Sequence, residues 1–384
     1  MIQYIGKVGT KSFDELKLNE IDFAFLAWAS YLGFPSLYEK EGSPFVLGKS
    51  TFRDFSSQKG KTIRVLLKDV LSDKENFPFA YSYFSSERYK DVVLKEYRVV
   101  ESKKDRIQYG AFLFEVRKDL YVLSFRGTNL NLYGWEEDCN MLLGDIPSDA
   151  LAVEDLKRME KDVPVNARLV LCGHSKGGHL ALYAPLYVPT QVQDHIEALY
   201  SFDGPGAYAP LNGHPSFARV KNKIHKFVPV NDWIGGLLMD YKDGVQIVNA
   251  KKGNGIAQHS VMTWFIKGNA FERKKERTKS SYVLEKTFDE WVYSYDSKTK
   301  KEVIAGLSYF LDECGFKKIS DFGEDFLSQM RSLLTISSKS DKNGRGLFFK
   351  ATKEFARRYI RNYFSYKKER KEDFPLLKRR KPSL

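Results

Sequence analysis

The feature that most constrains the fold is a serine between two glycines, in residues 173–177, which read Gly-His-Ser-Lys-Gly. An apolar segment of strand length, residues 167–172, precedes it, and a helix-forming segment of mostly small or apolar residues, Gly178–Leu186, follows it. A strand, a sharp turn with Ser at its tip and a helix together lift a serine hydroxyl clear of a sheet. Flanking glycines permit the strained turn and a close approach of helix to strand. The pattern predicts that Ser175 is a nucleophile, and the competing interpretation is a glycine-rich turn that merely exposes a serine.

Further apolar segments alternate with helical ones along the chain. Strands alternating with helices predict an α/β fold with a mainly parallel sheet covered by helices on both faces. The two earliest strands form a hairpin, because only a Lys-Asp turn separates them. The predicted strands are Ala111–Arg117, Leu120–Phe125, 167–172, Ile196–Phe202, Lys223–Val230 and Val245–Asn249. The clearest predicted helices are Leu18–Leu32, Thr62–Ser72, Trp135–Leu143 and Ser148–Lys161.

The length of 384 residues suits one large α/β domain with extensions, or two domains, and the segments below favour one domain with helical extensions at both ends. Residues 1–100 are predicted to be an N-terminal extension or a cap over the active site, and the sequence leaves the two open. Residues 101–285 are predicted to form the core and 286–336 a helical C-terminal part of the same domain. A polar linker and a basic amphipathic tail are predicted to occupy 337–384.

Composition excludes several classes of protein. With 42% hydrophobic residues the chain can bury a sizeable core, so global disorder is excluded. The cysteines at 139, 172 and 314 match no disulfide framework or zinc spacing, which favours a reducing compartment. The first 15 residues lack a basic start with an apolar run, and no stretch has the roughly 18 apolar residues of a membrane span. These features predict a soluble, cytoplasmic protein.

The net charge of +13 is concentrated at the C-terminus, where residues 350–384 hold thirteen basic and four acidic residues. Residues 347–366 read as a basic amphipathic helix, with an aromatic stripe of Phe348, Phe355, Tyr359 and Tyr363 joined by Ile360 and Phe364. Three interpretations of residues 347–384 stay open. They are a solvated helix packed on the domain, attachment to an anionic membrane surface, and nucleic-acid binding, which no known reader motif supports. The oligomeric state is not predicted.

A serine nucleophile needs a base to remove its proton and an acid to orient that base. In α/β-hydrolases the chain order is Ser, then Asp or Glu, then His. Of six histidines, only His259 follows the last predicted core strand and both candidate acids. The acids Asp203 and Asp232 each end a strand, at the sheet edge where sites form. The usual position favours Asp232, with Asp203 as the alternative, and a plain Asn-Asp turn is the competing interpretation of Asp232.

The negative oxygen of an acyl-transfer intermediate needs hydrogen-bond donors aimed at it. The backbone N–H of Lys176, next to the nucleophile, is one candidate. The second is Thr128, in the turn Phe125–Thr128 that follows an earlier strand. Neither a nucleotide-binding loop nor a metal-ligand pattern is visible, so no cofactor and no metal are predicted.

Taken together, these motifs resemble a known family. Phe-Arg-Gly-Thr at 125–128, Trp135 with Asp138, Gly-His-Ser-Lys-Gly-Gly at 173–178 and Ser-Phe-Asp-Gly-Pro-Gly at 201–206 resemble the motif series of the class 3 (fungal-type) lipases. They are closer still to a bacterial branch of lipase-like α/β-hydrolases, in which Lys after the Ser, Asp-Gly-Pro-Gly and Gln-His are typical. The similarity covers roughly residues 5–315. It implies an α/β-hydrolase fold with Ser175 as nucleophile, Asp232 as acid, His259 as base and Thr128 as the oxyanion residue.

Two departures from the fungal-type pattern bear on the substrate. Lys176 stands where those lipases usually carry an apolar residue, and residues 129–134 are short and polar where they carry an apolar lid. The sequence therefore predicts a serine hydrolase acting on carboxylic esters, lipid or other acyl esters. The alternatives are a thioesterase, acyltransferase or peptidase on the same fold, and a catalytically silent binding protein that works through its basic tail.

Overall fold

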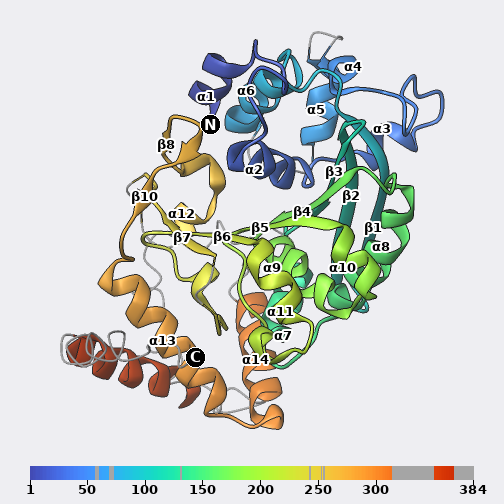
Figure 1. The fold of residues 1–384 in the computed structure, drawn as a ribbon. Coiled ribbons are helices and arrows are strands. Elements are labelled where there is room, and N and C mark those ends of the chain that lie inside the picture. Colours follow the sequence, from blue (N-terminus) through green and yellow to red (C-terminus); the bar gives the residue numbers. More distant parts are fainter. Residues whose placement is uncertain are drawn as a thin grey trace, which may run out of the picture. The chain divides into compact units, whose positions relative to one another are not determined.

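The computed structural model describes residues 1–56, 60–68, 73–129, 132–241, 244–251, 253, 256–313 and 350–366. Two compact units divide the chain, Met1–Lys275 and Glu276–Leu384 (Figure 1). The first unit holds the sheet and every predicted site residue, and each unit is described by itself below.

An eight-stranded sheet forms the centre of the first unit, in the order β1-β2-β3-β4-β5-β6-β7-β10. Strands β3 to β7 run parallel, whereas β1, β2 and β10 pair antiparallel at the two edges. A separate small hairpin is formed by β8 and β9. The bounds are β1 Val93–Ser102, β2 Ile107–Arg117, β3 Leu120–Phe125, β4 Arg168–His174, β5 Ile196–Phe202, β6 Ile224–Pro229, β7 Val245–Val248, β8 Ile266–Lys267, β9 Ala270–Phe271 and β10 Arg273–Lys274.

Helices cover both faces of this sheet. The bounds are α1 Ile2–Val8, α2 Glu20–Ala29, α3 Pro35–Tyr38, α4 Phe52–Ser56, α5 Lys61–Leu67, α6 Asp73–Phe84, α7 Leu132–Asn140, α8 Pro147–Met159, α9 Lys176–Tyr183, α10 Thr190–His195, α11 Phe217–Val220 and α12 Ile256–His259. Helix α2 packs on one face, against β3, β4 and β5, while α8 and α9 pack on the other.

The strand sequences explain why both faces are covered. Neighbouring residues of a strand point to opposite faces. On β3, Val122 belongs to the apolar core under α2 and Leu123 to the core under α8 and α9; on β4, Val170 and Leu171 divide in the same way. All four are at most 1% exposed, and burying such a side chain contributes about 1.5–3 kcal/mol. A mainly parallel sheet with helices on both faces confirms the predicted α/β-hydrolase fold.

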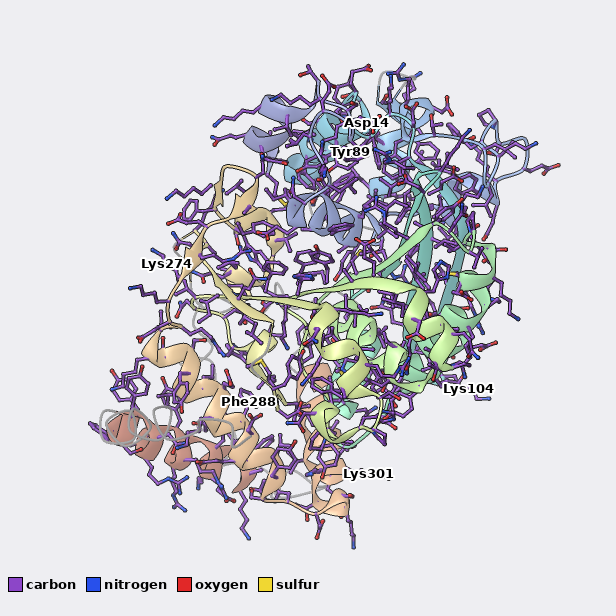
Figure 2. All side chains as sticks on the ribbon, viewed as in Figure 1. Asp14, Tyr89, Lys104, Lys274, Phe288 and Lys301 are labelled. Carbon is purple, nitrogen blue, oxygen red and sulfur yellow. The ribbon has the colours of Figure 1, made fainter. Side chains whose placement is uncertain are left out.

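The N-terminal hundred residues share the compact unit of the sheet. Asn19 caps α2 by accepting a hydrogen bond from the N–H of Ile21 at 3.0 Å, close to the predicted helix start. Asp22 is completely buried and pairs with Arg88 at 2.6 Å, which ties α2 to the segment before β1. Tyr89, labelled in Figure 2, also donates to Asp22. These residues form a packed layer on the sheet, and the predicted boundary between residues 100 and 101 falls inside β1.

The second unit is helical where the structure describes it. It contains α13 Lys279–Tyr293, α14 Ser297–Glu313 and a helix over residues 350–366. The ring of Phe355 lies 4.7 Å from that of Phe288, centroid to centroid, and packs against α13. The predicted boundary at 285/286 falls inside α13, and the one at 336/337 lies outside the described residues.

The predicted aromatic stripe of the C-terminal helix is divided between two faces. Phe355 is buried against α13, whereas Ile360 and Phe364 are 57% and 80% exposed. Grouping these side chains on one face is therefore wrong, and Phe348 lies outside the described residues. Within the described parts of the chain, none of the helices has the length and apolar character needed to cross a membrane. Binding of residues 347–384 to an anionic membrane surface stays a prediction.

Candidate active site

The elbow has the predicted strand–turn–helix geometry. Strand β4 ends at His174, Ser175 has φ 58° and helix α9 begins at Lys176. A positive φ is strained for a serine, and the close packing around the turn holds it there. A Cβ on Gly173 would lie 2.1 Å from the carbonyl oxygen of Gly177, so only glycine fits this approach. Ser175 is half-buried, and its hydroxyl makes no hydrogen bond to any residue that the structure describes.

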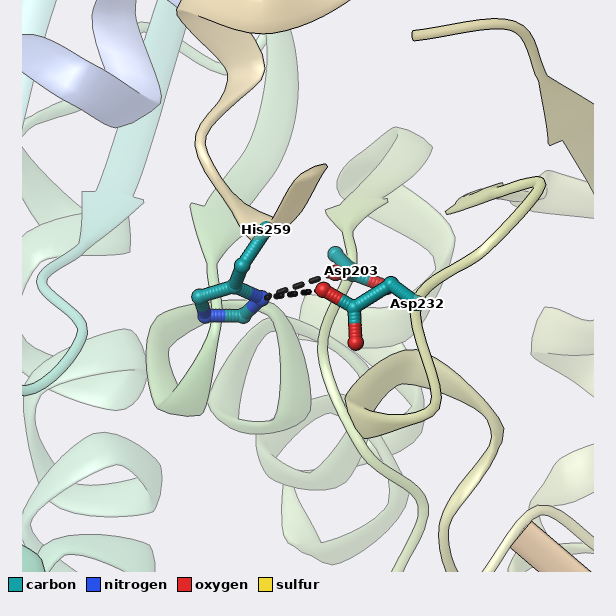
Figure 3. Close-up of side chains that lie close together, drawn as sticks. All are labelled: Asp203, Asp232 and His259. Carbon is teal, nitrogen blue, oxygen red and sulfur yellow. Dashed lines mark hydrogen bonds and ion pairs between the residues drawn. The ribbon is translucent and has the colours of Figure 1, made fainter. Parts of the chain in front are cut away.

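Three further candidate residues meet at the same edge of the sheet (Figure 3). Asp203 directly follows β5, Asp232 follows β6, and His259 ends α12. Nδ1 of His259 lies 2.7 Å from Oδ2 of Asp203 and 3.6 Å from Oδ2 of Asp232. The structure thus brings the predicted base together with both candidate acids, and Asp203 makes the shorter contact.

Burial dominates the electrostatics of this group. Both carboxyl side chains are completely buried, and the side chain of His259 is 17% exposed. Each carboxyl accepts one backbone N–H, from Ile234 at 2.7 Å for Asp232 and from Gly235 at 3.1 Å for Asp203. Burial, and then the neighbouring charge of Asp203, raise the pKa of Asp232 well above its usual range. Burial lowers the pKa of His259, so the imidazole stays neutral and able to accept a proton.

The same three side chains are also the candidates for holding a cation. Their nitrogen and oxygen atoms lie within 4.8 Å of one another. The hydrogen bond from His259 to Asp203 already uses the atoms that a metal would need, and it is the arrangement expected of an acid and a base. The prediction that this site needs no metal stays a prediction, which a chelator can test.

His174, the neighbour of Ser175, contacts the backbone of His259. Its Nε2 lies 2.7 Å from the carbonyl oxygen of His259, and this oxygen can only accept, so Nε2–H donates. Nδ1 therefore accepts the hydroxyl proton of Tyr31, at 2.9 Å. Burial lowers the pKa of His174 to about 3, which keeps the ring neutral, and the two hydrogen bonds select this tautomer. The rings of His174 and His259 lie 4.6 Å apart, centroid to centroid.

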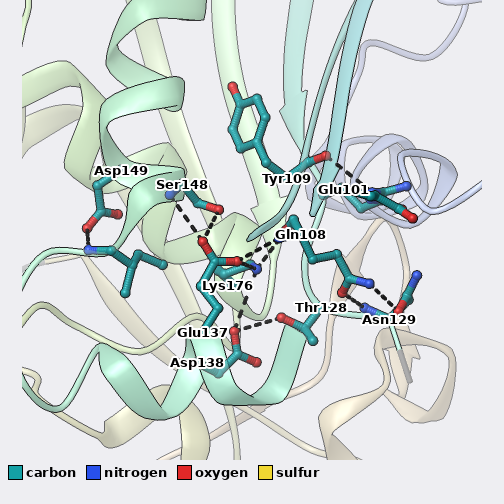
Figure 4. Close-up of polar contacts among 12 residues, drawn as sticks. Glu101, Gln108, Tyr109, Thr128, Asn129, Glu137, Asp138, Ser148, Asp149 and Lys176 are labelled. Carbon is teal, nitrogen blue, oxygen red and sulfur yellow. Dashed lines mark hydrogen bonds and ion pairs between the residues drawn. The ribbon is translucent and has the colours of Figure 1, made fainter. Parts of the chain in front are cut away.

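The loop after β3 carries the second candidate oxyanion donor (Figure 4). The hydroxyl of Thr128 donates to Oδ1 of Asp138, on α7, at 2.7 Å. The next residue, Asn129, donates its N–H to the side chain of Gln108, on β2, at 2.8 Å, and Gln108 donates back to the Asn129 side chain. These contacts hold the loop from both sides and fix the position of the Thr128 backbone.

The side chain of Lys176 points into the protein and is 1% exposed. Its Nζ donates to Oε2 of Glu137 at 2.6 Å and to the carbonyl oxygen of Gln108 at 2.7 Å. Glu137 also accepts from the hydroxyl and the N–H of Ser148, at 2.6 Å and 3.1 Å. Lys176 therefore links the elbow to α7 and β2, the elements that also contact residues 128–129 after β3.

Comparison with known proteins identifies the family. A family model described as Mbeg1-like matches residues 83–308, more than half of the 384 residues. The chain belongs to the Mbeg1-like family. Among solved structures, a mutant form of MDLA from Penicillium cyclopium is 15% identical with a TM-score of 0.34, covering 62% of this chain and 83% of its own. M37 lipase is 14% identical with a TM-score of 0.32, covering 57% of this chain and 69% of its own. No curated protein sequence matches the chain.

The Mbeg1-like match spans every residue that the sequence singled out for the site, from Thr128 to His259. Sequence reasoning missed Tyr31, which lies before the matched region and reaches His174 across 143 positions of the chain. It also missed the partners of Lys176. No local pattern marks either contact, because both depend on how distant elements pack. The one signal in the sequence that could have indicated a buried Lys176 is its charge, because the residues around it at the start of the helix are mostly small or apolar.

Proposed function

We propose that this Mbeg1-like protein is a serine hydrolase that cleaves carboxylic esters through an acyl-enzyme on Ser175. The observation that supports it most is the placement of His259. His174, the neighbour of Ser175, binds the backbone of His259, and buried carboxyl groups orient the imidazole at Nδ1. This arrangement leaves Nε2 of His259 for the serine.

In the proposed reaction, Nε2 of His259 takes the proton of the Ser175 hydroxyl as Oγ bonds to the ester carbonyl carbon. The tetrahedral intermediate collapses, the C–O bond to the alcohol breaks, and His259 returns the proton to the leaving alkoxide. Water, deprotonated by the same imidazole, then attacks the acyl-enzyme and releases the acid and free Ser175. The hydrogen bond between Ser175 and His259 forms when substrate is bound, as is common at such sites.

The oxyanion of each tetrahedral intermediate is proposed to accept from the N–H groups of Lys176 and Thr128. The N–H of Lys176 lies in the first turn of α9, where backbone donors have no partner within the helix. The contacts of Thr128 with Asp138, and of Asn129 with Gln108, support a loop whose position is already fixed before substrate binds. Preorganised donors of this kind contribute about 2.7–4 kcal/mol each to the transition state.

The substrate class proposed is a carboxylic ester of a lipid or another acyl group. Thioester, amide and acyl-transfer chemistry share the same steps, so a panel of ester, thioester and amide substrates separates them. A binding protein without catalysis is the remaining alternative, and it predicts no reactive serine.

Labelling with a fluorophosphonate probe tests the proposal. We expect the wild type to be labelled and Ser175→Ala to be unlabelled, because the probe bonds covalently only to an activated serine. Ser260→Ala is the matched control: this exposed serine adjoins His259 and should leave labelling unchanged. Labelling that persists in Ser175→Ala would place the nucleophile elsewhere, and an unlabelled wild type would favour the binding protein. Labelling that disappears with a chelator and returns with a divalent cation would contradict the metal-free mechanism.

The pH dependence of the labelling rate is a second test. His259 must be neutral to accept the serine proton, so the rate falls as the pH drops through its pKa. Because burial lowers this pKa from 6.5, we expect the midpoint of the acidic limb below pH 6.5. The measurement is the labelling rate of the wild type across a pH series, with unfolding followed in parallel. A midpoint above pH 6.5 would contradict a buried, neutral base.

A further inference from the structure

Two completely buried carboxyl groups, those of Asp203 and Asp232, lie next to the single imidazole of His259. If Asp203 and Asp232 were both ionised, two negative charges would share a buried site next to a neutral His259. Like charges in such a site cannot both persist, and the usual outcome is that one carboxyl keeps its proton. One aspartate must therefore carry the negative charge while the other keeps its proton. The choice between them made below rests on the function proposed above.

Distances to His259 distinguish the two carboxyl groups. The hydrogen bond from Nδ1 to Asp203 measures 2.7 Å, within the range of charge-assisted N–H···O contacts. The separation of 3.6 Å to Asp232 is beyond an ordinary hydrogen bond. As His259 takes up a proton, the positive charge on its ring is stabilised most by the carboxylate in direct contact. That carboxylate is Asp203.

We propose that Asp203 and Asp232 act as one acid group holding a single proton, with Asp203 ionised against His259 and Asp232 neutral and hydrogen-bonded to Asp203. Asp203 is thus the positioning residue of the base. Asp232, at the position that the lipase-like motifs favour for the acid, supports Asp203.

The contacts within the pair agree with this assignment. One oxygen of each carboxyl and a ring nitrogen of His259 lie within 4.8 Å of one another, so the two carboxyl groups are close enough to share one proton. Burial and the charge of Asp203 raise the pKa of Asp232 well above its usual range, so Asp232 is the partner that keeps the proton. The N–H groups of Ile234 and Gly235 donate one to each carboxyl, and these consecutive residues fix the two side chains relative to each other.

The backbone at Asp203 is as unusual as that at Ser175. Asp203 has φ 54°, a left-handed conformation that aspartate and asparagine tolerate better than most residues. Its N–H donates to the carbonyl of Phe227 on β6 at 2.8 Å, and a Cβ on Gly235 would lie 2.2 Å from its Oδ1. The strained turn after β5 aims this carboxyl at His259, as the strained elbow after β4 presents Ser175.

The experiment compares Asp203→Asn with Asp232→Asn, in hydrolysis of p-nitrophenyl acetate and in labelling by the fluorophosphonate probe. Each change keeps the size of the side chain, and asparagine suits the positive φ at position 203. We expect Asp203→Asn to lower kcat by about 10³- to 10⁴-fold with little change in KM, because the imidazole loses its orienting charge. We expect Asp232→Asn to lower kcat by less than about tenfold, because its amide can still donate to Asp203.

Infrared spectroscopy tests which aspartate holds the proton without any measurement of activity. The infrared C=O band of a protonated carboxyl should be present in the wild type at neutral pH and absent in Asp232→Asn. A larger loss of kcat in Asp232→Asn than in Asp203→Asn, or no infrared band in the wild type, would overturn the assignment. Thermal unfolding of both variants separates these effects from misfolding. If the wild type is not labelled at all, the proposed hydrolase fails, whereas the infrared band still decides the protonation of the pair.

Discussion

Replacing His259 by alanine is expected to lower kcat/KM toward p-nitrophenyl acetate by about 10⁴- to 10⁶-fold. The Ser175 hydroxyl is a weak nucleophile while it keeps its proton, and the neutral imidazole of His259 is the base proposed to remove that proton. Two contacts hold His259 in place, the 2.7 Å hydrogen bond from its ring to Asp203 and the hydrogen bond from His174 to its backbone oxygen. A water molecule in the place of the imidazole would have neither contact, so we expect it to be a poor substitute for this base. The measurement is steady-state hydrolysis together with the rate of fluorophosphonate labelling.

His214→Ala is the matched control for this change. His214 is half-buried in the loop after β5, where its Nδ1 accepts the N–H of Ser216 at 3.2 Å and its ring lies 4.6 Å from that of Tyr187, centroid to centroid. Its replacement should leave both rates within about twofold of the wild type, as expected for a surface change. Equal rates in His259→Ala and the wild type would remove His259 from the mechanism. Loss of folding in His259→Ala, seen by circular dichroism, would direct the test to His259→Gln, which keeps a polar side chain of similar length.

Replacing Glu137 by alanine is expected to reduce the free energy of unfolding by about 3–5 kcal/mol. The ammonium of Lys176 is 1% exposed and would lose its partner at 2.6 Å. It would keep the carbonyl oxygen of Gln108 at 2.7 Å and Asp138 at 3.7 Å, too little to offset a buried charge. Equilibrium unfolding in urea measures the change, followed by tryptophan fluorescence.

Glu136→Ala supplies the control one position away. Glu136 pairs with Arg106 at 3.1 Å, and the arginine side chain is 54% exposed whereas the glutamate side chain is 17% exposed. A surface pair of this kind contributes about 0–1 kcal/mol, so the control should unfold nearly as the wild type does. A loss for Glu137→Ala no larger than that for Glu136→Ala would mean that Lys176 finds water or another partner. Glu137→Gln separates charge from hydrogen bonding, because the amide keeps the contacts with Ser148.

Much of the fold is predictable from local patterns. The strands of the parallel core read as apolar runs, and β4, β5, β6 and β7 lie within two residues of their predicted ends. Strand β1 is not predicted, because it is an edge strand and its charged residues interrupt the apolar pattern of a buried strand. Lys95 pairs with Glu115, and Arg98 with Glu154, so its polar side chains have partners that only the neighbouring elements supply.

The features of the site fall into the same two groups, those that local sequence predicts and those that only packing produces. The sequence alone determines the elbow at Ser175, because flanking glycines and an apolar strand are local requirements of that turn. It also determines that His259 follows both acids in the chain. Only the tertiary structure decides which acid contacts the base, since β5 and β6 are neighbours in the sheet and deliver both carboxyl groups to one imidazole. The same holds for Lys176 and Tyr31, whose partners are far away in sequence: contacts of that kind arise from packing, and no local spacing encodes them.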